Sequence, residues 1–162
     1  MKFFQSLIIL LAIGFFAACG GPKIVPATPT TKPVNVQGSS ENLHDMLILL
    51  AKYKKYEILS DDGKSSARIK YDRKDKQGNL ILSITYDIKN SDSEYTMSYV
   101  DSQNMGYNNG QINGNYLRYI NMFDSTLKRM YSDPAYLNRM KNIVAGKNAD
   151  GTEKVVPAQQ TK

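Results

Sequence analysis

The hydrophobic residues of the chain follow three successive patterns: a continuous run, a helical spacing and a strict alternation. The continuous run extends from Leu7 to Phe16. Further along, apolar residues recur every three or four positions, and this spacing predicts a helix over about 41–53. Ser39 or Ser40 is the expected N-cap of that helix. Its apolar positions are Leu43, Met46, Leu47 and Leu50.

Alternation of apolar and polar side chains then predicts three β-strands, within residues 67–72, 80–88 and 95–100. The strands are separated by two short segments rich in turn-forming residues, KDKQGN and KNSDSE. Strands joined by such short turns pair antiparallel, so we expect a meander. Each strand has one apolar face, and a sheet with one apolar face needs a cover of helices.

Two more helices are predicted after a loop over 101–115, which is rich in Gly and Asn. The first spans about 114–131 and has an apolar stripe. The second spans about 134–145, with Asp133 as the N-cap and Pro134 at the first helical position. The expected fold class is therefore α+β. Its order is helix, three-stranded antiparallel meander, helix and short C-terminal helix, with the helices packed on one face of the sheet.

The ends of the chain differ in composition from this domain, which we place at 41–145. Residues 1–18 combine Lys2, the apolar run and small residues, which is the pattern of a secretory signal peptide. The run is too short to span a membrane, because a hydrocarbon core of ~30 Å takes about 20 residues. Residues 19–40 are rich in Pro, Gly, Thr and Ser and predict a disordered tether. The polar residues 146–162 predict a disordered tail.

The end of the apolar run carries the single cysteine of the chain. Ala17 and Ala18 precede Cys19, and this sequence resembles the lipobox of bacterial lipoproteins, although Phe16 stands where leucine is usual. The resemblance implies that Cys19 receives a diacylglycerol thioether and, after cleavage, becomes the N-terminal residue with an amide-linked fatty acid. Gly20 in place of aspartate implies the outer membrane of a Gram-negative bacterium, on the periplasmic side. The alternative is a plain signal peptide that ends near a cysteine.

Charge and composition argue against several other classes of protein. The formal net charge is +6, but residues 41–145 contain fifteen Lys and Arg against thirteen Asp and Glu. Because the remaining basic residues are scattered over the two ends, we expect no nucleic-acid partner. A single cysteine permits no intrachain disulfide. The mature chain of 144 residues (162 minus 18) must therefore fold around an ordinary core.

Candidate catalytic chemistry is sparse. One histidine and one cysteine cannot form a His and Cys metal site. His44 stands among polar neighbours without a carboxylate pattern, so we interpret it as a surface residue. Asp61 and Asp62 precede Gly63, which indicates a turn more than a pair of acids for acid/base catalysis. We therefore expect a protein that is not an enzyme and that holds no cofactor and no metal.

A second motif lies in the segment YTMSYVDSQNMGYNNGQINGNYLRYINMFDSTL, residues 95–127. It resembles a family of small proteobacterial lipoproteins of uncharacterised function. That family has a tyrosine-rich strand, an Asp-Ser-x-Asn-Leu-x-Tyr loop, and Ile-His-x-x-Tyr-Asn-x-Trp at the start of a helix. Met105, Asn113, Leu117 and Tyr119 replace the leucine, histidine, asparagine and tryptophan of the motif. The matching residues are Tyr95, Tyr99, Asp101, Ser102, Asn104, Tyr107, Ile112 and Tyr116.

Three functional hypotheses follow. The first is a lipid-anchored, non-catalytic accessory or protein-binding lipoprotein, which contacts an envelope protein through a sheet edge or the 101–115 loop. The second is a module that binds peptidoglycan or another glycan through the rings of Tyr99, Tyr107, Tyr116 or Tyr119. The third is a hydrolase whose site the sequence does not reveal. Besides Cys19 for lipidation, the candidate binding residues are Asp101, Ser102, Asn104, Tyr107, Tyr116 and Tyr119. Each also has a structural interpretation, in turns or in the core.

Overall fold

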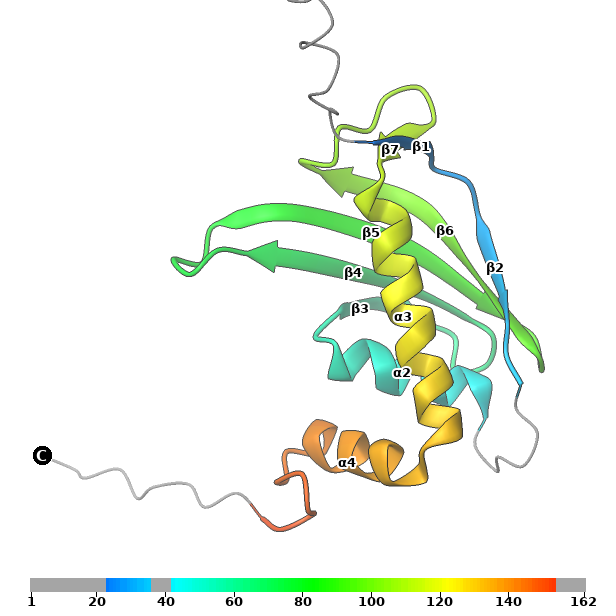
Figure 1. Cartoon of the computed structure of the whole chain (residues 1–162), viewed down its shortest axis with the longest axis vertical. Coiled ribbons are helices and arrows are strands. Elements are labelled where there is room, and N and C mark those ends of the chain that lie inside the picture. The colour runs from blue at the N-terminus through cyan, green and yellow to red at the C-terminus, as the bar shows by residue number, and fades with distance from the viewer. Residues whose placement is uncertain (1–22, 36–41, 154–162) are drawn as a thin grey trace, which may run out of the picture.

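The computed structural model describes residues 23–35 and 42–153, so the predicted signal peptide, Cys19 and Ser39–Ser40 lie outside the described residues. The described part is an α+β fold in which the helices lie on one face of a curved antiparallel sheet (Figure 1). Its elements are β1 (Ile24–Pro26), β2 (Thr30–Pro33), α2 (Leu43–Tyr53), β3 (Glu57–Asp61), β4 (Ser66–Lys74), β5 (Leu80–Asn90), β6 (Glu94–Gln103), β7 (Gln111–Asn113), α3 (Asn115–Ser132) and α4 (Pro134–Val144).

The prediction of a three-stranded meander was wrong. Strands β4, β5 and β6 do pair antiparallel, but they form the centre of a five-stranded sheet in the order β2-β6-β5-β4-β3. Strand β3 adds to one edge and β2 to the other, while β1 and β7 form a separate two-stranded sheet. Strand β3 was missed because its sequence, EILSD, has no alternation. Ile58 faces Ile69 across the β3–β4 pair, and a bulge at Leu59 interrupts the period of two.

The N-terminal strands correct the predicted tether as well. Residues 23–35 are part of the fold, because β1 pairs with β7 and β2 pairs with β6. Val25 and Val34 are buried in the core. This segment shows no alternation, but the free edges of β6 and β7 offer it a row of backbone hydrogen bonds. Those bonds and the two buried valines offset the entropy of ordering a Pro- and Thr-rich chain.

Strand β6 continues three residues beyond its predicted end, so the predicted loop over 101–115 was also misplaced. Asp101–Gln103 belong to β6, and β7 and the start of α3 occupy the second half of the segment. A bulge lies at Val100, between the pairs Tyr86↔Tyr99 and Thr85↔Asp101. The loop itself comprises residues 104–110, and Asn104 and Asn109 have positive φ there.

The helices begin and end close to their predicted bounds. Asn42 caps α2 by accepting a hydrogen bond from the His44 backbone, in place of the predicted serines. Asp133 caps α4 as predicted, accepting from the backbone N–H of Tyr136. Part of the predicted disordered tail is ordered, because Lys147 donates to the Asn142 carbonyl at the end of α4. No helix within the described residues is long and apolar enough to span a membrane.

The core lies between the sheet and the helices. The side of α3 that faces the sheet packs aromatic and aliphatic side chains against β5 and β6, and α2 adds five more buried apolar side chains. Ring contacts join α3 to the sheet, with Tyr116 stacked on Tyr86 and Phe123 against Tyr95. Buried members of the core include Met46, Leu47, Leu50, Ala51, Ile69, Ile84, Ile88, Met97, Ile120 and Leu127.

Candidate functional site

The candidate residues of β6 and the following loop are occupied by local hydrogen bonds. The Asp101 carboxylate accepts from the backbone N–H of Ser102 at 2.8 Å. The Ser102 hydroxyl lies 3.1 Å from the hydroxyl of Tyr99. Asn104 donates its side-chain amide to the carbonyl of Ile81 at 3.1 Å. These bonds hold the end of β6 and the first residue of the loop in place, which is the structural role expected of such residues.

The candidate tyrosines do not form one surface. Tyr107 is 47% exposed, and its ring stacks on Tyr99 with the centroids 4.5 Å apart. Tyr116 is fully buried, and its hydroxyl donates to the Thr28 carbonyl at 3.1 Å, which ties the β1–β2 connection to α3. Tyr119 instead contacts Tyr71, with the centroids 5.0 Å apart. The predicted residues are therefore split between an exposed loop, the core and a second aromatic group.

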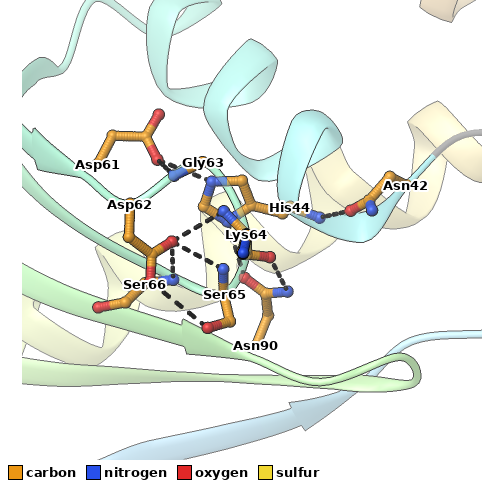
Figure 2. Close-up of polar contacts among 9 residues, drawn as sticks. All are labelled: Asn42, His44, Asp61, Asp62, Gly63, Lys64, Ser65, Ser66 and Asn90. Atoms are coloured by element: carbon orange, nitrogen blue, oxygen red, sulfur yellow. Dashed lines mark hydrogen bonds and ion pairs between the residues drawn. The ribbon is translucent and has the colours of Figure 1, made fainter.

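A cluster that sequence reasoning missed lies where α2 begins, where the β3–β4 turn bends and where β5 ends (Figure 2). We call His44, Asp61, Asp62 and Asn90 the His44 cluster. The prediction that His44 lies on the surface was wrong, since its side chain is only 4% exposed. Its Nε2 atom lies 2.8 Å from Asp61 Oδ1, and its Nδ1 atom lies 3.0 Å from Asn90 Oδ1.

The orientation of the Asn90 side-chain amide determines whether the His44 imidazole must carry a proton on both ring nitrogens to satisfy its hydrogen bonds. Asn90 Nδ2 donates to the Lys64 carbonyl, at the limit of 3.5 Å, so its Oδ1 atom faces His44. Both ring nitrogens of His44 thus face oxygen acceptors. A neutral imidazole can donate from one nitrogen only, and an imidazolium donates from both. The geometry therefore favours a protonated His44 beside an ionised Asp61.

The electrostatics of the cluster agree with this assignment. Burial alone lowers the pKa of His44, but the hydrogen bonds to Asn90 and Asp61 and the charges of Asp61 and Asp62 outweigh it, so that pKa is raised. The N–H of Gly63, followed by His44, lowers the pKa of Asp61. Three backbone N–H groups, from residues 64–66, lower the pKa of Asp62 to about 2. Both carboxyls are therefore ionised at neutral pH.

The cluster has the composition of an acid/base or metal site, but both ring nitrogens of its histidine are already engaged. An acid/base histidine needs one ring nitrogen free for a substrate, and both nitrogens of His44 are bonded inside the protein. Ligand atoms of His44, Asp61 and Asp62 lie within 4.8 Å of one another, which a divalent cation could use. A cation would have to displace the His44–Asp61 bond. The arrangement serves best as a structural tie between α2, β3 and β5.

A groove of about 720 Å³ lies far from β1, between the end of β2, the β5–β6 turn and the C-terminal end of α3. Glu94 and Lys128 give its lining both signs of charge. Lys128 also forms an ion pair with Asp124, at 2.9 Å. The remaining lining residues are Pro33, Val34, Asn35, Ser93, Tyr131 and Ser132. This mixed polar lining has no feature that selects one ligand chemistry.

Comparison with known proteins identifies no relative of this chain, since neither a protein-family model nor a curated protein matches it. The resemblance of residues 95–127 to a lipoprotein family therefore stays a prediction that rests on the motif alone.

Proposed function

We propose that the protein is a lipoprotein of the Gram-negative envelope, anchored by lipid on Cys19 at the periplasmic side of the outer membrane. Its domain would be a non-catalytic accessory module that binds an envelope protein. The observation that carries the proposal is the sequence Ala17-Ala18-Cys19 at the end of the apolar run. Cleavage before Cys19 leaves every described residue in the mature chain, because the described residues begin at Lys23.

The state of the single histidine supports a non-catalytic role. His44 is buried, and both its ring nitrogens are bonded to other residues of the protein. The adjacent carboxylate of Asp62 is likewise held by backbone N–H groups of its own turn. The histidine of the most catalysis-like cluster among the described residues therefore has no ring nitrogen left for a substrate.

The outer edge of β3 is the part of the sheet best suited to a protein partner. Strand β3 is the last strand on its side of the sheet, and the bulge at Leu59 leaves that side chain 46% exposed. Strand β2, at the opposite edge, ends in Pro33, which has no N–H to donate. An edge strand with an exposed apolar side chain can contact a partner strand over a short length, and the bulge limits that length.

Glycan binding is the weaker alternative. It needs several exposed rings on one surface, and only Tyr107 of the candidate tyrosines is both exposed and in the loop. Tyr116 is in the core, and Tyr119 belongs to a different aromatic group. A single aromatic ring stacked on Tyr99 provides little of the extended platform that a sugar chain requires.

The first test of this proposal is metabolic labelling with a radioactive fatty acid in cells that express the full chain. The native chain and the control variant Gly21→Ala should be labelled and should fractionate with the outer membrane. Cys19→Ala should carry no label. Equal labelling of Cys19→Ala and the native chain, or no labelling of any of them, would refute the anchor.

The second test places a photo-crosslinking residue at Leu59 and, as a control of matched exposure, at Met122 on α3, which are 46% and 47% exposed. Position 59 should yield one discrete adduct with an envelope protein, and this adduct should disappear when Cys19 is replaced. An adduct with peptidoglycan, or equal adducts from both positions, would contradict protein binding at the β3 edge.

A further inference from the structure

The first described strand lies very close in sequence to the predicted lipid anchor. Only four peptide units connect Cys19 to Lys23, and whatever their conformation they span at most about 14 Å. A tether extending to residue 40 could instead have spanned about 70 Å. Because residues 23–35 are ordered, the segment between Cys19 and the domain is much shorter than the predicted tether. If Cys19 is lipidated, as proposed above, one end of the domain is held at the membrane surface.

That end is the one formed by β1, β7 and the loop at 104–110, whereas α4 lies at the opposite end of the molecule (Figure 1). The attachment of Lys23 to the domain is tight. The Lys23 carbonyl accepts from the Gly114 N–H at 2.6 Å, and Val25 pairs with Ile112. The chain therefore joins the domain at the two-stranded sheet and at Gly114, directly before α3.

The surface at this end suits the headgroup region of a bilayer. The two segments that build it, 24–31 and 102–117, contain no Asp, Glu, Lys or Arg, although 22% of the whole chain is charged. Ile24 is 50% exposed and Tyr107, whose ring stacks on Tyr99, is 47% exposed, so an aliphatic and an aromatic side chain are about half accessible at this end. Tyrosine, with an apolar ring and a polar hydroxyl, is enriched at membrane interfaces.

The charges that border this surface also fit a membrane. Lys23 and Arg118 are exposed and basic, and they flank the uncharged segments, with Asp101 as the exposed acid nearby in the sequence. Basic residues beside a surface are attracted to anionic lipid headgroups within about a Debye length, ~8 Å.

The opposite end of the domain lies beyond the range of this attraction. At 1.5 Å per residue, the 18 residues of α3 extend about 27 Å from this end toward α4. Helix α4 is therefore well outside that range.

We propose that the surface formed by Lys23, Ile24 and the loop at 104–110, which carries the exposed Tyr107, lies against the phospholipid bilayer. This inference rests on the lipid anchor of the proposed function. The domain is thereby oriented with the Tyr107 loop in the headgroup region, while α4 and the groove near Tyr131 face away from the membrane.

Tryptophan fluorescence tests the orientation directly, because the chain contains no tryptophan. The variants are Tyr107→Trp and Ile24→Trp at the membrane end, with Ile143→Trp on α4 as the control. All three positions are partly exposed, at 47%, 50% and 38%. Each full-length lipidated variant is reconstituted into vesicles of phosphatidylethanolamine and phosphatidylglycerol, with and without bromine on the acyl chains. The mass of each preparation reports whether Cys19 is lipidated.

Brominated lipid should quench most of the emission at positions 107 and 24 and leave that at position 143 unchanged. Equal quenching at all three positions, or no quenching at positions 107 and 24, would overturn the orientation. If Cys19 is lipidated and position 107 is unquenched, the inference fails while the lipid anchor stands. A blue shift at position 107 with peptidoglycan fragments alone would assign the loop to a glycan. An unlipidated Cys19 overturns both the anchor and the orientation.

Discussion

Replacing His44 with alanine should destabilise the domain in a manner that depends on pH. The change removes two hydrogen bonds, to Asn90 and to ionised Asp61. A neutral hydrogen bond contributes about 1 kcal/mol and one to a charged group about 1.5–3 kcal/mol. The Asp61 side chain is 31% exposed and regains some hydration in the variant. The expected loss of unfolding free energy is therefore about 2–3 kcal/mol at about pH 6.

The sign of the pH dependence follows from the two pKa shifts. The pKa of His44 is raised on folding, so its contribution is complete below its ordinary value of 6.5 and is lost as the pH rises through the folded value. The pKa of Asp61 is lowered, so its contribution is present above its ordinary value of 3.8 and is lost in stronger acid. The pair therefore stabilises the fold most between about pH 4 and pH 6.5.

Urea unfolding of the mature chain with Cys19 replaced by serine provides the assay, at about pH 6 and about pH 8.5. The difference between the native protein and His44→Ala should shrink at the higher pH. Lys52→Ala, an exposed change on the same helix, is the control and should cost little at either pH. A difference that is the same at both pH values, or below about 0.5 kcal/mol at pH 6, would refute the ionised His44–Asp61 pair.

Three other predictions follow from the packing. In Gly114→Ala, the new Cβ would lie 2.9 Å from the carbonyl oxygen of Lys23. Amide hydrogen exchange in β1 should therefore become faster, while α4 stays protected. Unchanged exchange in β1 would contradict the tight attachment of Lys23. Asp133→Ala removes the cap of α4 and should cost about 1 kcal/mol in urea unfolding, whereas no cost would show that the cap is dispensable. The Tyr86 hydroxyl is buried with no partner among the described residues, so Tyr86→Phe should stabilise by about 1 kcal/mol, and a loss of stability would reveal a partner.

The sequence predicts those elements whose signal is local. The alternation in β4, β5 and β6 reflects one face on the core and one in water, so it predicts these strands directly. The Asp133-Pro134 pair predicts the start of α4 in the same way. By contrast, β1 and β2 depend on the free edges of strands about 60 to 90 residues away in the sequence. No local period marks such edge strands, and their Pro and Thr content is typical of a tether.

In the candidate site, too, only features with a local sequence signal could be predicted. The exposure of Tyr107 agrees with the interpretation of its loop as a surface feature, and the burial of Tyr116 follows from the helical stripe of α3. The His44 cluster could not be predicted, because Asp61 reaches His44 only through β3 and its turn. Strand β3 was itself missing from the prediction, and a histidine near a helix start has no spacing signal for a partner 17 residues away.

Mass spectrometry of the protein extracted from the cell envelope tests the central claim most directly. The mature chain should begin at Cys19, and its N-terminal peptide should carry the added mass of a diacylglycerol on sulfur and a fatty acid on nitrogen. An N-terminal residue other than Cys19, or an unmodified thiol at that position, would contradict the lipid anchor and the membrane orientation that depends on it.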